Sequence, residues 1–192
     1  SFAAIAATGE VAFRVGSEPL DPERRYWRAI VLNAMDGPTW IRGEPPPGET
    51  LRVVGERRLT QEFFCEPRQG RYLPTLDLPV QVPGMPHRDV GERTFTTLRR
   101  DERRLHYRAI SVLDGYLEQT GRIDRQFYLA MATAPSERVA AVGRRIAAEG
   151  STAEQRISLL EEFFRAQKLN YATTDLPGPN DPVDVFLFEK KR

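Results

Sequence analysis

The spacing of apolar residues changes once along this chain, close to residue 134. Before that point the chain contains short strand-like runs separated by turn signals; over 9–16 apolar and polar residues alternate, and a period of two is typical of a half-buried β-strand. From Ser136 onward apolar residues recur every three or four positions, which is the spacing of an amphipathic helix. The sequence therefore predicts an α+β, mainly β fold, with an antiparallel β-sandwich-like domain over 1–133 and a two-helix region within 134–192.

Several short strands are expected in the first of these domains. Residues 26–32 are rich in aromatic and β-branched side chains, and they are predicted to form a hairpin with 39–42 around the turn signal Asp36-Gly37-Pro38. A second hairpin is predicted between 94–99 and 104–112. Three prolines in the stretch Gly43–Gly48 lack a backbone N–H, so the stretch is expected to be an exposed loop. Further strands are expected at 9–16, 51–54 and 59–64.

Two helices are predicted after the β-rich part. Ser136 is a suitable cap for a helix over 136–149, and Gly150 ends it. The segment Ser151-Thr-Ala-Glu154 reads as a capping box that opens a second helix over 152–168. Its apolar face is expected to contain Ile157, Leu160, Phe163 and Phe164.

Charge and composition exclude several classes of function. The 28 basic and 27 acidic residues leave a net charge of +1, and acidic residues are interspersed with the basic ones, so no nucleic-acid partner is expected. No apolar run approaches the roughly 18 residues that a membrane helix needs. No phosphate-binding glycine loop, Ser-His-Asp elbow or metal motif is present, so no cofactor is expected.

The chain has a single cysteine, Cys65, and two histidines, His87 and His106. A catalytic Cys–His dyad or a zinc site made from all three is conceivable. However, all three lie in predicted strands or loops and lack the close ligand pairs of a zinc site. A buried cysteine acting as a small hydrophobic residue is the favoured interpretation. We therefore assign no catalytic, cofactor-binding or metal residue to this chain.

Four other residues could have a functional role, but a structural role is the favoured interpretation for each of them. Trp27 and Trp40 could form a stacking platform for a sugar or a peptide, but paired tryptophans in a sandwich more often anchor the core. Asp181 and Asp184 could be an acid pair, but Asp181 precedes Pro182, a context typical of a turn. The following run from Phe186 to Phe188 is predicted to be a strand.

Five segments carry a resemblance to a known family. They are the stretches Gly9–Val15, Tyr26-Trp27-Arg28 and Asp36-Gly37-x-Thr39-Trp40, the helix 152–168 with Asn170-Tyr171 after it, and Asp181-Pro-Val-Asp-Val-Phe-Leu-Phe-Glu-Lys-Lys-Arg192. Together they resemble the extracytoplasmic part of the bacterial membrane-anchored transglutaminase-like family, which is also labelled as cysteine proteases. Ala29 and Pro38 depart from the usual pattern of the family and put only the local turn geometry in doubt.

The resemblance implies that this chain is a non-catalytic N-terminal part of a transglutaminase-like cysteine enzyme. In the family a Gly-x-Cys-Glu-His motif follows the Phe-Leu-Phe run within a few residues, and a Cys-His-Asp triad acts on amides of a protein or peptide substrate. Here the triad would lie after Arg192, so 134–192 would begin a transglutaminase-like core that lacks its nucleophile. The resemblance also implies a periplasmic or extracytoplasmic location, as part of a membrane-anchored parent protein.

The same reading sets expectations for the C-terminal end. Phe186, Leu187 and Phe188 should lack part of their packing partners, which could lead to self-association of the chain. The apolar stripe on the helix 152–168 should be only partly covered. Two alternatives stay open: a stand-alone β-sandwich module that binds an envelope protein or glycan through exposed aromatics such as Trp40 and Tyr72, and a cytosolic hydrolase that uses Cys65.

Overall fold

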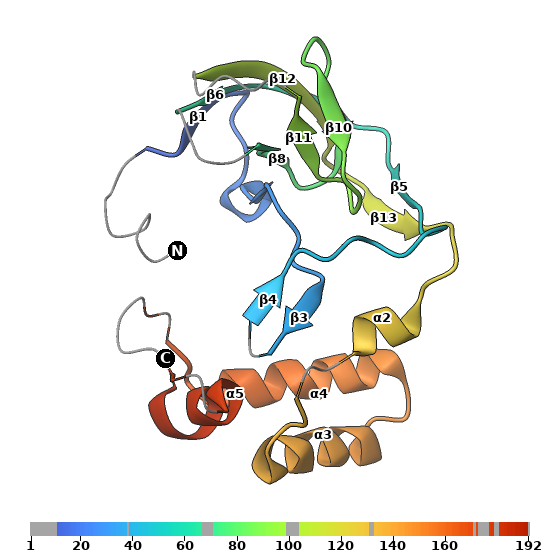
Figure 1. Cartoon of the computed structure of the whole chain (residues 1–192). Coiled ribbons are helices and arrows are strands. Elements are labelled where there is room, and N and C mark those ends of the chain that lie inside the picture. The colour runs from blue at the N-terminus through green and yellow to red at the C-terminus, as the bar shows by residue number, and fades with distance from the viewer. Residues whose placement is uncertain are drawn as a thin grey trace. The chain divides into compact units, whose positions relative to one another are not determined.

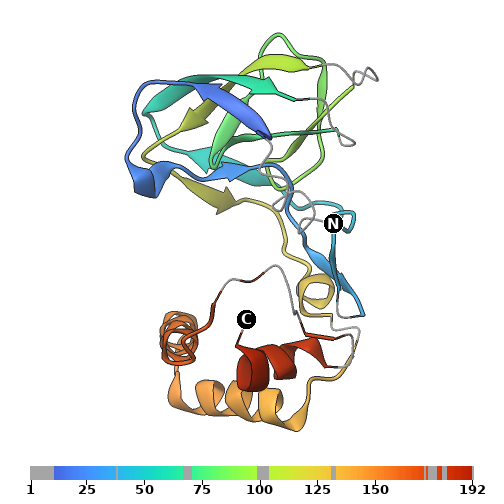
Figure 2. The same cartoon turned by 90° about the vertical axis from the view of Figure 1, so that its left-hand side faces the viewer.

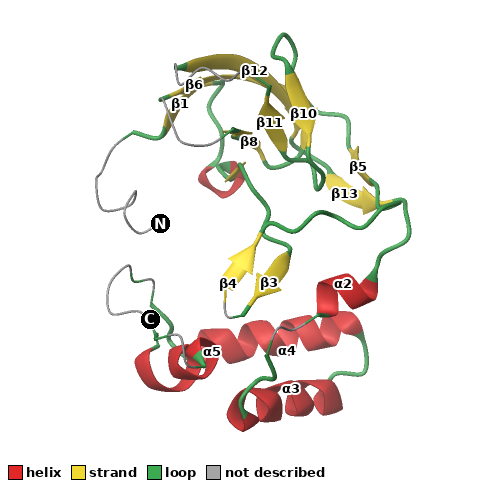
Figure 3. Ribbon diagram, in the orientation of Figure 1, coloured by secondary structure: helices red, strands yellow, loops and turns green. Residues whose placement is uncertain are grey.

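The computed structural model describes residues 11–37, 39–66, 71–98, 104–130, 133–170, 172, 177–178 and 181–191. The chain divides into two compact units. The first contains the described residues within 10–34 and 40–130 and is called the β unit here. The second contains 35–39 and the described residues after 131, and is called the helical unit. Strands dominate the first unit and helices the second (Figure 3). The predicted division into domains 1–133 and 134–192 stays a prediction.

The largest sheet of the β unit has four antiparallel strands in the order β1-β6-β12-β9. They are β1 (Phe13–Gly16), β6 (Arg58–Cys65), β12 (Leu105–Val112) and β9 (Pro79–Gln81). The two eight-residue strands β6 and β12 pair along their whole length, from Leu105 opposite Cys65 to Val112 opposite Arg58. Side chains on β6 alternate between buried and more exposed, as expected for a strand with one face on the core.

The other sheets are smaller and are also antiparallel where their register is known. Strands β10 (His87–Asp89), β11 (Phe95–Thr97) and β7 (Tyr72–Leu73) form a three-stranded sheet. The two-stranded sheets are β13 (Tyr116–Gln119) with β5 (Leu51–Val54) and β2 (Trp27–Arg28) with β8 (Thr75–Leu76). A further pair, β3 (Ala34–Asp36) with β4 (Thr39–Ile41), has its residues divided between the two units. A short 3-10 turn η1 (Pro22–Arg24) and the helix α2 (Arg125–Leu129) complete the β unit (Figure 1).

One apolar core joins the four-stranded and three-stranded sheets. Phe63 on β6 and Tyr107 on β12 stack with ring centroids 5.2 Å apart, and Leu73 on β7 and Phe95 on β11 belong to the same buried cluster. Because both sheets contribute to this cluster, the arrangement is the sandwich-like fold that the sequence predicted. The fold class, α+β and mainly β, is confirmed.

Both predicted hairpins are wrong. The strand at Trp27–Arg28 pairs with Thr75–Leu76, whereas the true hairpin joins β3 and β4 around Gly37, which has a φ of 55°. Strand β11 pairs with β10 and β7, and β12 pairs with β6 and β9. The predictions assumed that strands adjacent in the sequence pair with each other, but these pairings are set by contacts between distant segments. The stretch Gly43–Gly48 contains no strand or helix, as predicted.

The helical unit contains the two predicted helices, α3 (Glu137–Glu149) and α4 (Ala153–Ala166). The Ser136 side chain accepts a hydrogen bond from the backbone N–H of Val139, so Ser136 is the cap that the sequence indicated. The capping box of α4 lies one residue later than predicted, because Thr152 and Gln155 satisfy each other's backbone groups.

The C-terminal segment is helical, which contradicts the predicted strand at Phe186–Phe188. A short helix α5 (Pro182–Val185) runs into the π-helical turn η2 (Phe186–Lys190). The Asp181 side chain accepts a hydrogen bond from the N–H of Asp184, and Pro182 stands at the first helical position. These start signals outweigh the β propensity of the Phe-Leu-Phe run. Figure 2 shows this turn, in red, beside α3.

The apolar stripe of α4 is only partly covered within the unit. Ile157 is 58% exposed, and Leu160 and Phe164 are each 40% exposed, which confirms the expectation from the sequence. On the side that faces α3, the Arg145 guanidinium lies 5.9 Å from the ring centre of Phe163. None of the helices in the described part of the chain combines the length and the apolar character needed to cross a membrane.

Candidate functional site

Cys65 is buried at the end of β6, with 4% of its surface exposed. Its Sγ atom lies 3.7 Å from the hydroxyl oxygen of Tyr107, and this hydroxyl donates a hydrogen bond of 2.6 Å to the carbonyl oxygen of Pro74. The sulfur therefore faces the apolar core rather than a cleft that a substrate could enter. This position favours the interpretation of Cys65 as a small core residue.

The two histidines do not join Cys65. His106 lies opposite Phe64 in the ladder, and its exposed ring stacks on Phe64 with centroids 4.5 Å apart. Since neighbouring residues of a strand point to opposite faces, this ring lies on the other face of the sheet from Cys65. His87 contacts the carbonyl oxygen of Met85 through Nδ1, at 2.7 Å. Among the described residues, no group of three or more His, Cys, Asp or Glu side chains could hold a metal ion.

The two tryptophans have different environments. Trp27 is half-buried on β2, packs against the core cluster, and meets the ring of Phe13 edge-on with centroids 6.1 Å apart. Trp40 is 57% exposed and lies on β4, in another two-stranded sheet. A paired stacking platform is therefore not formed, and Trp27 is a core anchor. Tyr72, which was expected to be exposed, is only partly exposed.

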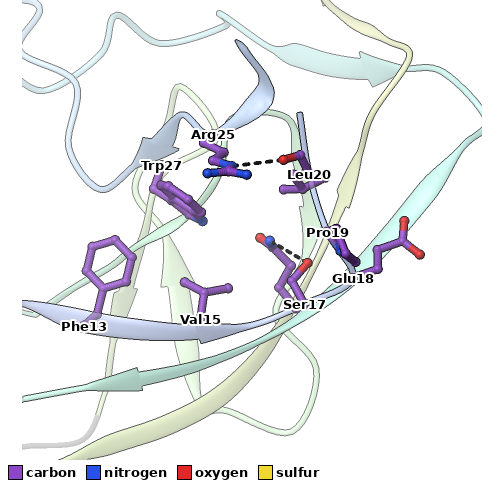
Figure 4. A pocket seen from close by; sticks show the side chains of 9 residues that line it. Phe13, Val15, Ser17, Glu18, Pro19, Leu20, Arg25 and Trp27 are labelled. Carbon is purple, nitrogen blue, oxygen red and sulfur yellow. Dashed lines mark hydrogen bonds between the residues drawn. The ribbon is translucent and has the colours of Figure 1, made fainter. Parts of the chain in front are cut away.

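A cavity of about 490 Å³ opens beside Trp27 in the β unit (Figure 4). The side chains of Phe13, Val15 and Leu20 provide apolar walls. Glu18 and Arg25, one acid and one base, are exposed residues that also line it. The cavity is formed by β1, the segment after it, β2 and β6, so residues far apart in the sequence create it.

Two polar groups in this cavity are unusual. Gln61 is 1% exposed, and its Nε2 donates a hydrogen bond of 3.1 Å to the hydroxyl oxygen of Ser17. Its Oε1 is buried without a hydrogen-bond partner among the described residues, and the same is true of the indole Nε1 of Trp27. Both atoms are buried and expose almost no surface to the cavity, whereas buried polar groups are nearly always paired.

A second cluster organises the C-terminal turn of the helical unit. Arg138 on α3 donates hydrogen bonds to both carboxylate oxygens of Asp184, and one to Glu189 at 3.0 Å. The hydroxyl of Ser136 donates to Asp184 at 2.5 Å, and the Arg138 guanidinium lies 5.0 Å from the ring centre of Phe188. Asp181 and Asp184 therefore do not form the acid pair that was considered from the sequence. Asp181 caps α5, and Asp184 binds Arg138.

Comparison with known proteins identifies the family. The family model described as "TgpA N-terminal domain" matches residues 1–118. The chain belongs to the TgpA N-terminal domain family. This match covers most of the chain and includes the whole cavity beside Trp27.

Solved structures of TgpA have the same fold. The chain is similar to the periplasmic domain of TgpA from Pseudomonas aeruginosa, with a TM-score of 0.83 and 24% identity over 98% of this chain and 67% of that one. The same domain bound to ethylmercury gives a TM-score of 0.82, also at 24% identity, over 98% of this chain and 68% of that one. No curated protein matches this chain significantly. The chain is the N-terminal part of a TgpA-like protein.

Sequence reasoning missed both the cavity and the Arg138–Asp184 cluster. One signal could have revealed the cavity. On β6 every second side chain is buried, and these residues are Leu59, Gln61, Phe63 and Cys65. A glutamine therefore occupies a position where an apolar side chain is expected. No comparable signal marks the Arg138–Asp184 pair, because its partners are 46 residues apart.

We predict that the Asp184 carboxylate makes the C-terminal turn sensitive to acid. The hydrogen bonds donated by Arg138 and Ser136 hold the pKa of Asp184 below its usual range. A lowered pKa in the folded state means that the stabilisation is fully present above the unfolded pKa of about 3.9, and is lost as the pH falls through the folded pKa. Wild-type protection of the Lys191 amide, which donates to the carbonyl of Phe186, should therefore decline in acid.

This prediction is checked by measuring hydrogen-exchange protection factors at several pH values between neutral and acidic. Asp184→Asn should lower the protection of Lys191 near neutral pH, and the difference from wild type should shrink in acid. Glu161→Gln removes a carboxylate from an exposed ion pair on α4 and is the matched control, with no expected effect on Lys191. An unchanged difference between wild type and Asp184→Asn at all pH values would contradict the assignment.

Proposed function

We propose that this chain is the non-catalytic N-terminal part of a transglutaminase-like cysteine enzyme at the bacterial cell envelope. The parent enzyme would carry out acyl transfer or hydrolysis on protein or peptide amides at the outer face of the inner membrane. The observation that carries the proposal is the match of 98% of this chain to about two thirds of the TgpA periplasmic domain. The remaining third of that domain has no counterpart here and leaves room for a catalytic part.

The proposed chemistry needs a cysteine thiolate. The thiolate adds to the amide carbonyl carbon, the amine leaves with a proton, and the resulting thioester passes its acyl group to an amine or to water. Cys65, the only cysteine of the chain, faces the core beside Tyr107 and lies on the opposite face of the sheet from His106. This burial supports a nucleophile located after Arg192, where the family resemblance places it.

The helical unit has two features that suit such a continuation. The stripe on α4 formed by Ile157, Leu160 and Phe164 is partly exposed and offers an apolar surface for a following sheet. The Arg138–Asp184 cluster fixes the turn α5–η2, and the N–H of Asn170 donates to the carbonyl of Lys191 at 2.8 Å. A fixed exit of the chain would orient a catalytic helix that begins a few residues later.

An activity assay tests the proposal on the chain itself. Incubated with a glutamine donor and a labelled amine acceptor, the chain should produce no conjugate above background, and Cys65→Ser should behave in the same way. Reaction with a thiol reagent should be slow in the folded protein and fast after unfolding in urea, because the sulfur is buried. Turnover by the chain that is lost in Cys65→Ser would contradict the proposal.

An alternative function has one observation in its favour. Trp40 and Tyr26 are 57% and 63% exposed, and exposed aromatics are common in binding surfaces. A stand-alone module that binds an envelope protein or a glycan would use such residues. Binding of envelope glycans that is lost in Trp40→Ala, by a protein that ends without a catalytic part, would favour this alternative over the enzyme.

A further inference from the structure

The helix α2, the last element of the β unit, is too short to be stable by itself. It has five residues, none of them is buried, and Leu129 at its end is 67% exposed. A helix of this length does not persist alone in water, because its few backbone hydrogen bonds do not offset the cost of ordering the first turn. Contacts outside the helix must therefore hold it on the β unit.

One carboxylate holds both ends of α2. The Asp124 N–H, at the start of the helix, donates a hydrogen bond of 2.7 Å to Oε1 of Glu49. The Tyr128 hydroxyl, in the last turn, donates one of 2.6 Å to Oε2 of the same carboxylate. Hydrogen bonds to an ionised group are roughly twice as strong as those between neutral groups. Glu49 therefore fastens the helix at two points with a single side chain.

Aromatic rings add to this attachment. Phe127 lies so close to Gly43 that a β-carbon added to that glycine would be 3.2 Å from the ring. The rings of Phe127 and Tyr128 meet edge-on with centroids 5.0 Å apart. Partial burial and the hydrogen bond to Glu49 raise the pKa of Tyr128 well above its usual range, so its hydroxyl keeps the proton that it donates.

The chain is fixed just before α2. The Thr120 N–H donates to the carbonyl oxygen of Thr50 at 3.0 Å, and the hydroxyl oxygens of the two threonines are 2.7 Å apart. A β-carbon on Gly121 would collide with the carbonyl oxygen of Gly48, so the backbones are in close contact there. When α2 detaches, the chain therefore becomes free just after Gly121, while β13 stays paired with β5.

Glu49 and Tyr128 also line a cavity of about 330 Å³. Asp89, Glu92 and Arg93, at the turn between β10 and β11, contribute to the same lining. Detachment of α2 would move Tyr128 away from Glu49, and the cavity would lose the wall that the tyrosine forms.

We propose that α2 is a latch that Glu49 holds closed. In the closed state the β unit extends to Ala130. In the open state it ends at Gly121, so the segment that leads to the helical unit becomes longer and the cavity beside Tyr128 opens. The latch is built wholly within the β unit, so it does not depend on the catalytic continuation proposed above.

Native-state hydrogen exchange of the whole chain, expressed as protection factors, tests the latch. The Phe127 N–H is hydrogen-bonded at the start of α2, and the Val112 N–H is hydrogen-bonded at the end of β12. Tyr128→Phe keeps the ring but removes one bond to Glu49, so the protection of Phe127 should fall roughly tenfold. The protection of Val112 should not change, because β12 is not part of the latch.

Two further variants assign the effect to Glu49. Glu49→Ala removes both attachments, so it should lower the protection of Phe127 by more than Tyr128→Phe does. Added to Glu49→Ala, Tyr128→Phe should have no further effect, because the hydroxyl has already lost its acceptor. Tyr116→Phe is the matched control, since it makes the same change at an exposed tyrosine on β13 and should leave the protection of Phe127 unchanged.

Limited digestion with trypsin gives an independent measurement. Arg125 is the first residue of α2, and cleavage after it requires the helix to open. The rate of this cleavage should therefore rise by the same factor as the protection of Phe127 falls in each variant.

The outcomes separate a latch from general destabilisation. An unprotected Phe127 N–H in the wild type would overturn the proposal, because α2 would then not be held. Additive effects of Glu49→Ala and Tyr128→Phe would overturn the role of Glu49, and an equal loss of protection at Val112 would overturn the local character of the opening. Glu49→Gln, which places an amide NH₂ where the carboxylate accepted a hydrogen bond, replaces Glu49→Ala if that variant does not fold.

Discussion

Replacing Phe63 with alanine is expected to lower the free energy of unfolding of the β unit by about 3–5 kcal/mol, the range for aromatic truncation in a close-packed core. The side chain is 0% exposed, stacks on Tyr107 with centroids 5.2 Å apart, and lies 6.1 Å from the ring of Phe13. Removing it leaves a cavity between the four-stranded and three-stranded sheets. Urea unfolding monitored by tryptophan fluorescence measures the loss.

The neighbouring residue is a matched control for this prediction. Phe64 has the same side chain on the same strand, but it is 43% exposed and stacks on His106 on the opposite face of the sheet. Phe64→Ala is therefore expected to cost less than about 1 kcal/mol. Equal losses for the two variants would mean that the register of β6 is wrong by one residue, since such a slip exchanges the two faces.

Replacing Trp27 with alanine should destabilise the β unit by about 3 kcal/mol, the lower end of the range for aromatic truncation, because the side chain is half-buried. The indole packs edge-on against Phe13 and against the buried cluster around Phe63. Its loss would also remove one wall of the cavity described above. Urea melts followed by circular dichroism are the appropriate measurement, because the variant loses a fluorophore.

Trp40→Ala supplies the comparison within the same chain. Trp40 is 57% exposed, so its truncation should change the stability by less than about 0.5 kcal/mol. A change below about 1 kcal/mol for Trp27→Ala would contradict its role as a core anchor. It would instead show that the core does not depend on the Trp27 side chain.

The elements that depend on local spacing were predictable from the sequence. A strand was predicted over 59–64, and a buried small hydrophobic residue was the favoured interpretation of Cys65; β6 and its burial pattern agree with both. The helices α3 and α4 were predicted to within about two residues at each end, because Ser136 and the Ser-Thr pair before α4 satisfy free N–H groups at a helix start. These features depend only on residues that are close together in the sequence.

Features that depend on distant partners were not predictable. Trp27 pairs with Leu76 in a ladder that no local turn signal could indicate. The Phe-Leu-Phe run of η2 has strand-like composition, but Asp181 and Pro182 start a helix before it, and Asp184 binds Arg138 on α3. The cavity beside Trp27 needs β1, β2 and β6 together, so its unpaired groups become visible only once the sheets are assembled.

The central claim is that the chain precedes the catalytic part of a transglutaminase-like enzyme, and the nucleotide sequence of the gene beyond codon 192 tests it most directly. The account predicts an open reading frame in which a Gly-x-Cys-Glu-His motif begins within a few codons of Arg192, followed later by the rest of the Cys-His-Asp triad. A stop codon directly after Arg192, or an open frame without that cysteine, would contradict the account and favour the binding module.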